Sequence, residues 1–294
     1  MRKPFHLAFL AFAFVAAVGF FKSAVADDKD AKTDQANVNV AHVFRSGEII
    51  GLPVKNKEGE HLGKIDDLVI DMKSGEVRYA ALSFGGFAGL GNKLFAVPFE
   101  KMMFVFGEPN KTNSRHFIFE VTKDQLEKAP GFDSSHWPNV ADPQWSASVD
   151  KHYNVTRKEQ VKTDSDANAP KVAYETVFRA SKMKGMDVRN DHDENLGSVD
   201  EIVIDVPKGQ VKYVALSFGS WFTGGNKLFA VPLTSFTLKH ANEKTFLVTH
   251  HSQEALKNAP GFDKSHWPDT ADLNWAKGID SYYERTAQRP TTRQ

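Results

Sequence analysis

The sequence predicts a mainly β protein of two small β-barrels, each followed by a Phe- and Trp-containing extension and a short amphipathic helix. Three observations predict this class. The chain of 294 residues contains two similar copies of one long unit. Each copy has several short segments rich in β-branched and aromatic residues, separated by turn residues. Each copy then ends in a helix-like segment with apolar residues four positions apart.

The repeat is clearest in two pairs of segments. Leu62–Gly85 recurs as Leu196–Gly219, and Phe84–Pro98 recurs as Phe218–Pro232, both 134 residues later. Farther along, the offset falls to 130, because the second copy is shorter near residues 106–115. That stretch is rich in turn residues, so we expect a hairpin tip there. Two copies are too few for a solenoid, and the sequence therefore predicts a duplicated domain.

The strands of the first copy can be placed from composition. Residues 65–71 and 77–84 are rich in strand-forming residues and are joined by a glycine-containing turn, which predicts a hairpin. Residues 93–98 and 117–121 are predicted to be further short strands. Pro98 marks a strand end, since proline cannot donate a backbone hydrogen bond. About five strands at this spacing favour a small barrel.

The end of each copy carries helix signals. Thr122 and Gln125 have the spacing of a capping box before a short helical turn, and Ser252 takes the capping position in the second copy. Asp142 followed by Pro143 predicts the start of a longer helix. The apolar stripe of this helix is Trp145, Val149 and Tyr153, repeated as Trp275, Ile279 and Tyr283.

The N-terminus is predicted to be a secretory signal. A short basic start precedes an apolar run from Leu7 to Phe21, and Ala24 and Ala26 are the small residues that a signal peptidase reads. The run is short for a bilayer, which needs roughly 20 apolar residues. We therefore expect cleavage after Ala26, with an uncleaved membrane anchor as the alternative. Cleavage would leave no stable membrane span and a periplasmic or secreted protein.

The predicted organisation, in chain order, is a signal peptide (1–26), a disordered leader (27–42), the first repeat with its helix (43–153), a linker (154–174), the second repeat (175–285) and a tail (286–294). The chain has 37 basic and 37 acidic residues, and loss of the signal leaves a net charge of −3. A mildly acidic exported protein is a poor candidate for nucleic-acid binding, which is driven by phosphate neutralisation. The absence of Cys excludes disulfides and thiolate metal sites.

The predicted barrel resembles the PRC-barrel family. The residues that carry the resemblance in the first copy are Gly51, Val54, Leu62, Gly63, Asp66, Asp67, Gly75, Tyr79, Val97 and Pro98. Their counterparts are Gly185, Val188, Leu196, Gly197, Asp200, Glu201, Gly209, Tyr213, Val231 and Pro232. The family is similar to the cytoplasmic part of the photosynthetic reaction-centre H subunit and to part of a ribosome maturation factor. The resemblance implies a fold and a binding or scaffolding role, with no catalytic set to carry over.

An Asp-x-x-His-Trp segment precedes the longer helix of each copy. Its residues are Asp133, His136 and Trp137, and again Asp263, His266 and Trp267. As chemistry, the His would be a metal ligand or a base oriented by the Asp. One imidazole and one carboxylate are too few for a closed zinc site, so no metal is predicted. As structure, the Asp caps a turn, the Trp fills an apolar gap and the His bonds a backbone carbonyl. Retention of the apolar neighbours favours this structural clasp, which would dock the helix on the barrel.

Three other features are given structural or partner-binding roles. The glycine-rich loop after residue 84 opens a strand rather than a helix, so it is not a phosphate loop; its apolar side chains, Phe87, Trp221 and Phe222, are candidate partner-binding tips. The acidic positions are expected to lie on a solvated strand face rather than to bind a cation. They are Asp66, Asp67, Asp71, Asp200, Glu201 and Asp205. The pair His250-His251 occurs in the second copy alone, opposite Glu120-Val121, so it is no shared site.

The sequence predicts an exported, non-enzymatic protein without a cofactor, which binds a protein partner or acts as a scaffold in the bacterial envelope. One alternative is a ligand- or metal-binding periplasmic protein that uses the Asp-x-x-His-Trp segments. Another is an accessory of membrane electron transfer, by analogy with the reaction-centre H subunit. A hydrolase is the remaining alternative, although no nucleophile motif is evident. The partner and the oligomeric state stay open.

Overall fold

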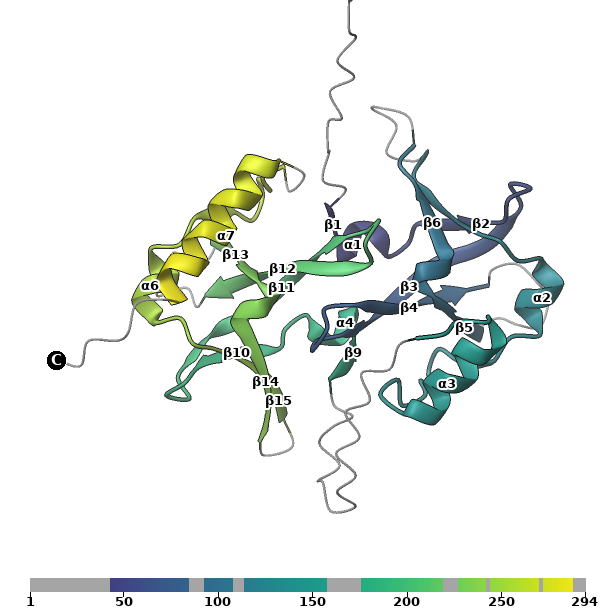
Figure 1. Cartoon of the computed structure of the whole chain (residues 1–294), viewed down its shortest axis with the longest axis horizontal. Coiled ribbons are helices and arrows are strands. Elements are labelled where there is room, and N and C mark those ends of the chain that lie inside the picture. Colours follow the sequence, from purple (N-terminus) through teal and green to yellow (C-terminus); the bar gives the residue numbers. More distant parts are fainter. Residues whose placement is uncertain are drawn as a thin grey trace, which may run out of the picture. The chain divides into compact units, whose positions relative to one another are not determined.

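The computed structural model describes residues 43–84, 93–107, 114–157, 176–218, 227–241, 244–269 and 272–287. Val40–Gln294 forms one compact unit, in which each repeat builds a sheet and a terminal helix (Figure 1). The predicted signal peptide, leader and loop tips Phe87, Trp221 and Phe222 lie outside the described residues. No helix in the described part of the chain is long and apolar enough to cross a membrane.

The first repeat contributes seven strands to one sheet, in the order β6-β7-β2-β3-β4-β5-β8. The strands are β2 (Pro53–Lys55), β3 (His61–Asp71), β4 (Val77–Ser83), β5 (Lys93–Pro98), β6 (Met102–Val105), β7 (His116–Phe119) and β8 (Gly131–Asp133). The predicted hairpin β3–β4 is present and antiparallel. β6 and β7, which flank the predicted hairpin tip, also pair antiparallel, and residues 108–113 of that tip lie outside the described residues. Among the described residues, β6 and β8 end the path without pairing to each other, so the barrel has an open seam.

The second repeat has the same strand order, β14-β15-β10-β11-β12-β13-β16. Its strands are β10 (Asp187–Asn190), β11 (Asn195–Asp205), β12 (Gln210–Phe218), β13 (Lys227–Pro232), β14 (Phe236–Ala241), β15 (Lys244–Thr249) and β16 (Gly261–Asp263). Short 3-10 turns, η1 (Phe99–Lys101) and η4 (Leu233–Ser235), follow the strands that end in Val-Pro. The expected mainly β class is confirmed.

A glycine holds the start of the long strand in each repeat. Gly63 has φ of +144° and Gly197 has φ of +148°. A Cβ at either position would lie 2.1 Å from a backbone oxygen of the neighbouring strand, that of Ser83 or Ser217. Because this distance is far below van der Waals contact, no other residue fits here without moving the strand pair.

The two sheets are completed by an exchange of one strand each. β1 (Val43–Arg45), at the start of the first repeat, pairs antiparallel with β11 of the second repeat. β9 (Val177–Arg179), at the start of the second repeat, pairs antiparallel with β3 of the first, with Arg179 opposite Val69. Both exchanged strands have the sequence Val-Phe-Arg. Each eight-stranded sheet therefore contains seven strands of its own repeat and one strand of the other.

A short helix follows each exchanged strand and lies against the same foreign sheet. These helices are α1 (Ser46–Ile49), which contacts β11, and α4 (Ala180–Met183), which contacts β3. Their apolar ends, Ile49 and Met183, are fully buried. The hairpin turns of the two repeats also bond to each other, because Val77 N donates to Gly209 O at 2.8 Å and Val211 N donates to Gly75 O at 2.8 Å.

The expectation of a solvated acidic face is wrong for three of the six acidic side chains. Asp67 is 3% exposed, Glu201 8% and Asp205 6%. The physical reason is the strand exchange, which covers this part of β3 and β11 with β9–α4 and β1–α1. Asp67 and Glu201 are bonded by serine hydroxyls of the foreign helices, and the Asp205 carboxylate is paired with Lys208 at 2.9 Å.

The helix starts predicted from capping residues are confirmed. The helices are α2 (Lys123–Glu127), α3 (Pro143–His152), α6 (Gln253–Lys257) and α7 (Leu273–Ala287). Thr122 and Gln125 form the capping box of α2, Ser252 caps α6, and the Asp142 side chain accepts from Gln144 N at the start of α3. Figure 1 shows α3 beside β5 and α7 beside β13, so each repeat ends with its long helix on its own sheet.

A buried tyrosine ties each long helix to its sheet. The Tyr79 hydroxyl donates to Asp150 Oδ1 of α3 at 2.9 Å, and the Tyr213 hydroxyl donates to Asp280 Oδ1 of α7 at 3.1 Å. Burial, and next the nearby carboxylate, raise the pKa of both tyrosines, so both remain donors at neutral pH. Trp145 packs edge-on against Tyr79 at 5.4 Å, as expected for the apolar stripe.

Arg157, within the predicted linker, packs on the first repeat. Its Nε bonds Asp150 Oδ2 at 3.0 Å, one terminal nitrogen bonds Glu76, and the other donates to Arg78 O at 3.0 Å. Its guanidinium also lies 4.9 Å from the centre of the Tyr79 ring. The chain that follows α3 is therefore held against the first repeat as far as Arg157.

Cutting the chain within residues 158–175 is expected to leave the two repeats joined. Arg157 is anchored on the β3–β4 hairpin, and Thr176 O accepts from Met72 N of the same hairpin at 2.7 Å. The exchanged strands and helices hold the halves without that segment. With a specific protease site inserted there, the cleaved protein should elute from a sizing column at the position of the uncut chain and separate in urea. Separate elution of the fragments in native buffer would contradict the exchange.

Candidate functional site

The Asp-x-x-His-Trp segment folds as a short strand and a tight turn. β8 pairs with β5, which places Asp133 opposite Lys93. The Asp133 Oδ1 atom accepts from Ser135 N at 2.7 Å and from Ser135 Oγ at 2.5 Å. Ser135 Oγ also lies 2.8 Å from His136 Nδ1. The three polar side chains therefore form one chain of hydrogen bonds, which we call the Asp-Ser-His turn.

The second repeat builds the same turn with the same distances. Asp263 Oδ1 accepts from Ser265 N at 2.7 Å and from Ser265 Oγ at 2.5 Å, and the hydroxyl lies 2.8 Å from His266 Nδ1. The serine bonds, and to a smaller extent the imidazole, lower the pKa of both Asp133 and Asp263. Both carboxylates are therefore ionised at neutral pH.

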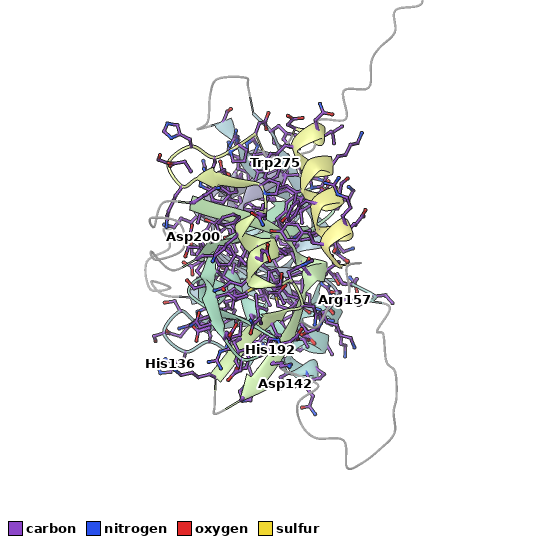
Figure 2. The ribbon with its side chains drawn as sticks, turned by 90° about the vertical axis from the view of Figure 1, so that its left-hand side faces the viewer. His136, Asp142, Arg157, His192, Asp200 and Trp275 are labelled. Carbon is purple, nitrogen blue, oxygen red and sulfur yellow. The ribbon has the colours of Figure 1, made fainter. Side chains whose placement is uncertain are left out.

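The polar side chains of the turn face solvent. His266 has 87% of its side chain exposed, and Asp263 has 52%. Figure 2 shows His136 at the periphery of the molecule, and it is likewise exposed. This differs from the structural expectation in one respect, because the imidazole bonds a serine hydroxyl and not a backbone carbonyl. The predicted role of the Asp as the cap of a turn agrees with its bond to Ser135 N.

The hydrogen bonds of the turn run in a different direction from those of a catalytic Ser-His pair, in which the serine hydroxyl donates to the imidazole. The single hydroxyl proton of Ser135 is donated to the Asp133 carboxylate. The hydroxyl can then only accept from the His136 ring, so the imidazole does not act as its base. The turn is therefore arranged to present a fixed carboxylate and imidazole to solvent.

The apolar side chains of the segment face the protein. Trp137 packs on Phe132 at 4.8 Å between ring centres, and Trp267 packs on Phe262 at 4.8 Å. Each Trp ring also receives a guanidinium from an exchanged strand. Arg179 of β9 lies 4.3 Å from the centre of Trp137, and Arg45 of β1 lies 5.0 Å from the centre of Trp267. The predicted clasp therefore holds the foreign strand as well as its own helix.

Sequence reasoning missed three pairs of residues that build this region. They are Ser135 and Ser265, Arg45 and Arg179, and Asp150 and Asp280. Each pair stands at matching positions of the two repeats. Their retention was the signal that could have found them, because a polar residue kept inside a repeated apolar segment usually has a bonded partner.

The other candidate residues do not form a further site. Among the described residues, no group of three or more His, Asp or Glu side chains is placed to hold a metal ion. Asp66 and Asp71 lie on β3, where Asp71 is 3.6 Å from the guanidinium of Arg78. Asp200 of β11 is paired with Lys264, next to the second turn. Asp71 and Asp200 are therefore paired with nearby cations, whereas burial, and next the charge of Asp67, raise the pKa of Asp66.

The pair His250-His251 differs from its counterpart in structure as well as in sequence. His250 is exposed and lies 3.0 Å from Asp191. His251 is 6% exposed and packs edge-on against Tyr283 of α7 at 4.9 Å. Its ring nitrogens lie 3.2 Å from the hydroxyl of Ser235 and 3.3 Å from that of Thr286. Burial, and then the charge of His250, lower the pKa of His251.

Two sheets of one strand order, each completed by a foreign strand and closed by a docked helix, define a tandem small-barrel protein. The family model for the PRC-barrel domain matches residues 41–126 and 175–253, more than half of the chain. The chain belongs to this family. No curated protein matches the chain. Both matched segments end before β8 and β16, so the Asp-Ser-His turns and the long helices lie outside the matched segments.

Substitution of Trp137 by Ala is expected to destabilise the protein far more than substitution of His136 by Ala. Trp137 loses contacts with Phe132 and with the Arg179 guanidinium, which we estimate to cost about 2–4 kcal/mol. His136 is exposed, so its loss should change the free energy of unfolding by about 0.5 kcal/mol or less. Urea unfolding of the two variants measures the difference, and equal losses would place the imidazole in the fold instead of at the surface.

Stability is expected to fall at mildly acid pH through His251. Because its pKa is lowered in the folded state, the unfolded chain binds the proton more readily below about pH 6.5. The contribution of the neutral imidazole is therefore complete above that pH and is lost as the pH falls toward the folded-state pKa. His251→Val, which installs the residue found at position 121, should flatten this part of the profile. Thermal unfolding from pH 7.5 to 5 tests it, and an unchanged slope would contradict the assignment.

Proposed function

We propose that the protein is an exported, non-enzymatic binding module that acts as a scaffold in the bacterial envelope. One observation carries the proposal. The Asp-Ser-His turn occurs twice, with the same internal bonds, on one compact unit. A polar surface element that is repeated on a firm support suits a partner that is bound at two places, where the second contact gains from the first.

The turn has the properties of a recognition element. Its carboxylate is ionised, its imidazole is exposed, and its backbone is fixed by the serine bonds. Preorganised polar groups lose little conformational entropy on binding, so they add affinity and orientation at low cost. The apolar side of the segment is used by Trp137 and Trp267 to hold the fold, which leaves the polar side for a partner. The resemblance to PRC-barrels, which are generally binding modules, supports the same role.

Export is the second part of the proposal, and it rests on the N-terminal sequence. A basic start, an apolar run from Leu7 to Phe21 and small residues at Ala24 and Ala26 form a secretory signal. Cleavage after Ala26 would release a mature chain that begins at Asp27. A chain without Cys requires no disulfide formation after transport.

Photo-crosslinking in intact cells tests the binding role. A photoreactive residue is placed at position 136 in one variant and at position 266 in another. We expect both to give a crosslinked product with the same partner, because the two turns present the same groups. A variant with the probe at Lys57, an exposed side chain of the first repeat, serves as the matched control.

The outcome that contradicts the proposal is the absence of a product common to positions 136 and 266, or the same product from Lys57. The intact mass of the protein from the same cells tests export separately. A chain that begins at Asp27 supports it, and a chain that retains residues 1–26 contradicts cleavage.

A further inference from the structure

The two buried acids at the exchange differ in length. Asp67 of β3 and Glu201 of β11 stand at matching positions, 134 residues apart. Each faces the short helix of the other repeat, α4 for Asp67 and α1 for Glu201. Elsewhere the two exchange sites share much of their chemistry, since both inserted strands are Val-Phe-Arg and both place an Arg over a Trp. The acids and their partners are therefore a point at which the two sites differ.

The Glu201 site requires a serine followed by a glycine. Ser46 Oγ donates to Glu201 Oε1 at 2.5 Å, and Ile202 N donates to the same oxygen at 3.0 Å. The other oxygen, Oε2, accepts from Lys184 Nζ at 2.7 Å. A Cβ at the next residue, Gly47, would lie 3.0 Å from that Oε2 and 3.5 Å from Lys184 Nζ. A larger residue at position 47 would crowd the ion pair.

The Asp67 site requires a serine one residue farther along. The Asp67 side chain is shorter by one methylene, about 1.5 Å. Its Oδ2 accepts from Ser181 Oγ at 2.5 Å, and its Oδ1 accepts from Ser181 N at 3.2 Å and from Leu68 N at 2.8 Å. Ser181 stands where α1 has Gly47, and the residue before it is Ala180, which carries no hydroxyl. The serine that donates to the acid therefore stands one residue later in α4 than in α1, where its hydroxyl reaches the shorter side chain.

We propose that these acid–serine pairs form a pairing code, by which each repeat accepts the unlike repeat and rejects a second copy of itself from another chain. The code reads Ser-Gly with Glu at one exchange site and Ala-Ser with Asp at the other. The main-chain pairing cannot discriminate, because the two inserted strands have one sequence and bond in equivalent register.

Pairing of two identical repeats from different chains would mismatch the acid and the serine, whether both are first repeats or both are second repeats. Two first repeats would set Ser46-Gly47 against Asp67, which is too short for the serine and finds no hydroxyl at the glycine. Two second repeats would set Ala180-Ser181 against Glu201, with no hydroxyl at the first position and a Cβ against the carboxylate at the second. Each buried carboxylate would keep the donors of its own repeat, Leu68 N for one acid and Ile202 N with Lys184 for the other, but would lose the hydroxyl of the foreign helix, and this loss is disfavoured for a buried charge. Because the exchange is reciprocal, each wrong pair would contain this fault twice.

The consequence is a chain that closes on itself. The unlike repeat is the accepted partner, and the linker keeps it at a high effective concentration. A second copy of the chain can compete only by offering its own unlike repeat, which has no such advantage. The partner chemistry of this surface is therefore fixed by six positions: 46, 47 and 201 at one exchange site, and 180, 181 and 67 at the other.

Transfer of the code tests the first half of the proposal in the full chain. Glu201→Asp alone should lower the folding equilibrium constant about 10- to 100-fold, because the shortened acid no longer reaches Ser46. The triple variant S46A/G47S/E201D installs the Ala-Ser and Asp set and should recover most of that loss. The matched control S46A/E201D lacks the new serine and should not recover. A triple variant as unstable as this control would overturn the code.

A disulfide trap tests the second half. Val43→Cys and Asp71→Cys would face each other if β1 of one chain paired with β3 of another, because the observed registers place Val43 opposite Asp205 and Val177 opposite Asp71. The chain has no other Cys, so a disulfide-linked dimer reports like-with-like pairing.

A chain that carries Val43→Cys and Asp71→Cys, and is otherwise unchanged, should give no linked dimer after refolding at high protein concentration under oxidising conditions. The triple variant makes both exchange sites alike, so at a protein concentration on the order of millimolar, comparable to the effective concentration that a linker provides, it should give linked dimers on a non-reducing gel. Equal amounts of linked dimer in the two backgrounds, or no dimer from a stable triple variant, would overturn the discrimination. Neither result bears on the binding role of the Asp-Ser-His turns, which photo-crosslinking tests separately.

Discussion

The main-chain pairing of β1 with β11 and of β9 with β3 is the interaction on which the rest of the structure depends. It completes both sheets and brings α1 and α4 over the acids of the foreign strands. It also places Arg45 and Arg179 over the two Trp rings that precede the long helices. An unpaired strand edge in a sheet is a template for unwanted association. The exchange covers this edge in both repeats with a strand from the same chain.

The parts of the fold that local chemistry determines were predictable. The capping residues at Thr122, Ser252 and Asp142 start helices where the sequence places them, and the predicted β3–β4 hairpin forms. The family resemblance was carried by strand and turn residues and is confirmed. The exchange was not predictable, because a Val-Phe-Arg strand fits either repeat and nothing in its pattern says which sheet it joins. The burial of Asp67 and Glu201 was missed for the same reason.

The candidate site was predicted in its residues and only partly in its arrangement. The Asp was expected to cap a turn and the Trp to fill an apolar gap, and both contacts are present. The imidazole lies against a neighbouring hydroxyl, that of Ser135, which occupies an unspecified position of the Asp-x-x-His-Trp pattern. A side chain that faces solvent has several partners within reach, and spacing alone does not choose among them.

Strand exchange also sets the order in which the chain can finish folding. Domains in a growing polypeptide usually fold one after another, beginning at the N-terminus. Here the first repeat has all of its own strands by residue 133, yet the edge of β3 stays open until Val177–Arg179 has been made. The earliest strand, β1, waits longer still, for β11 at Asn195–Asp205. Neither half can reach its final form before the other exists, so the two repeats reach their final form together, after both have been made.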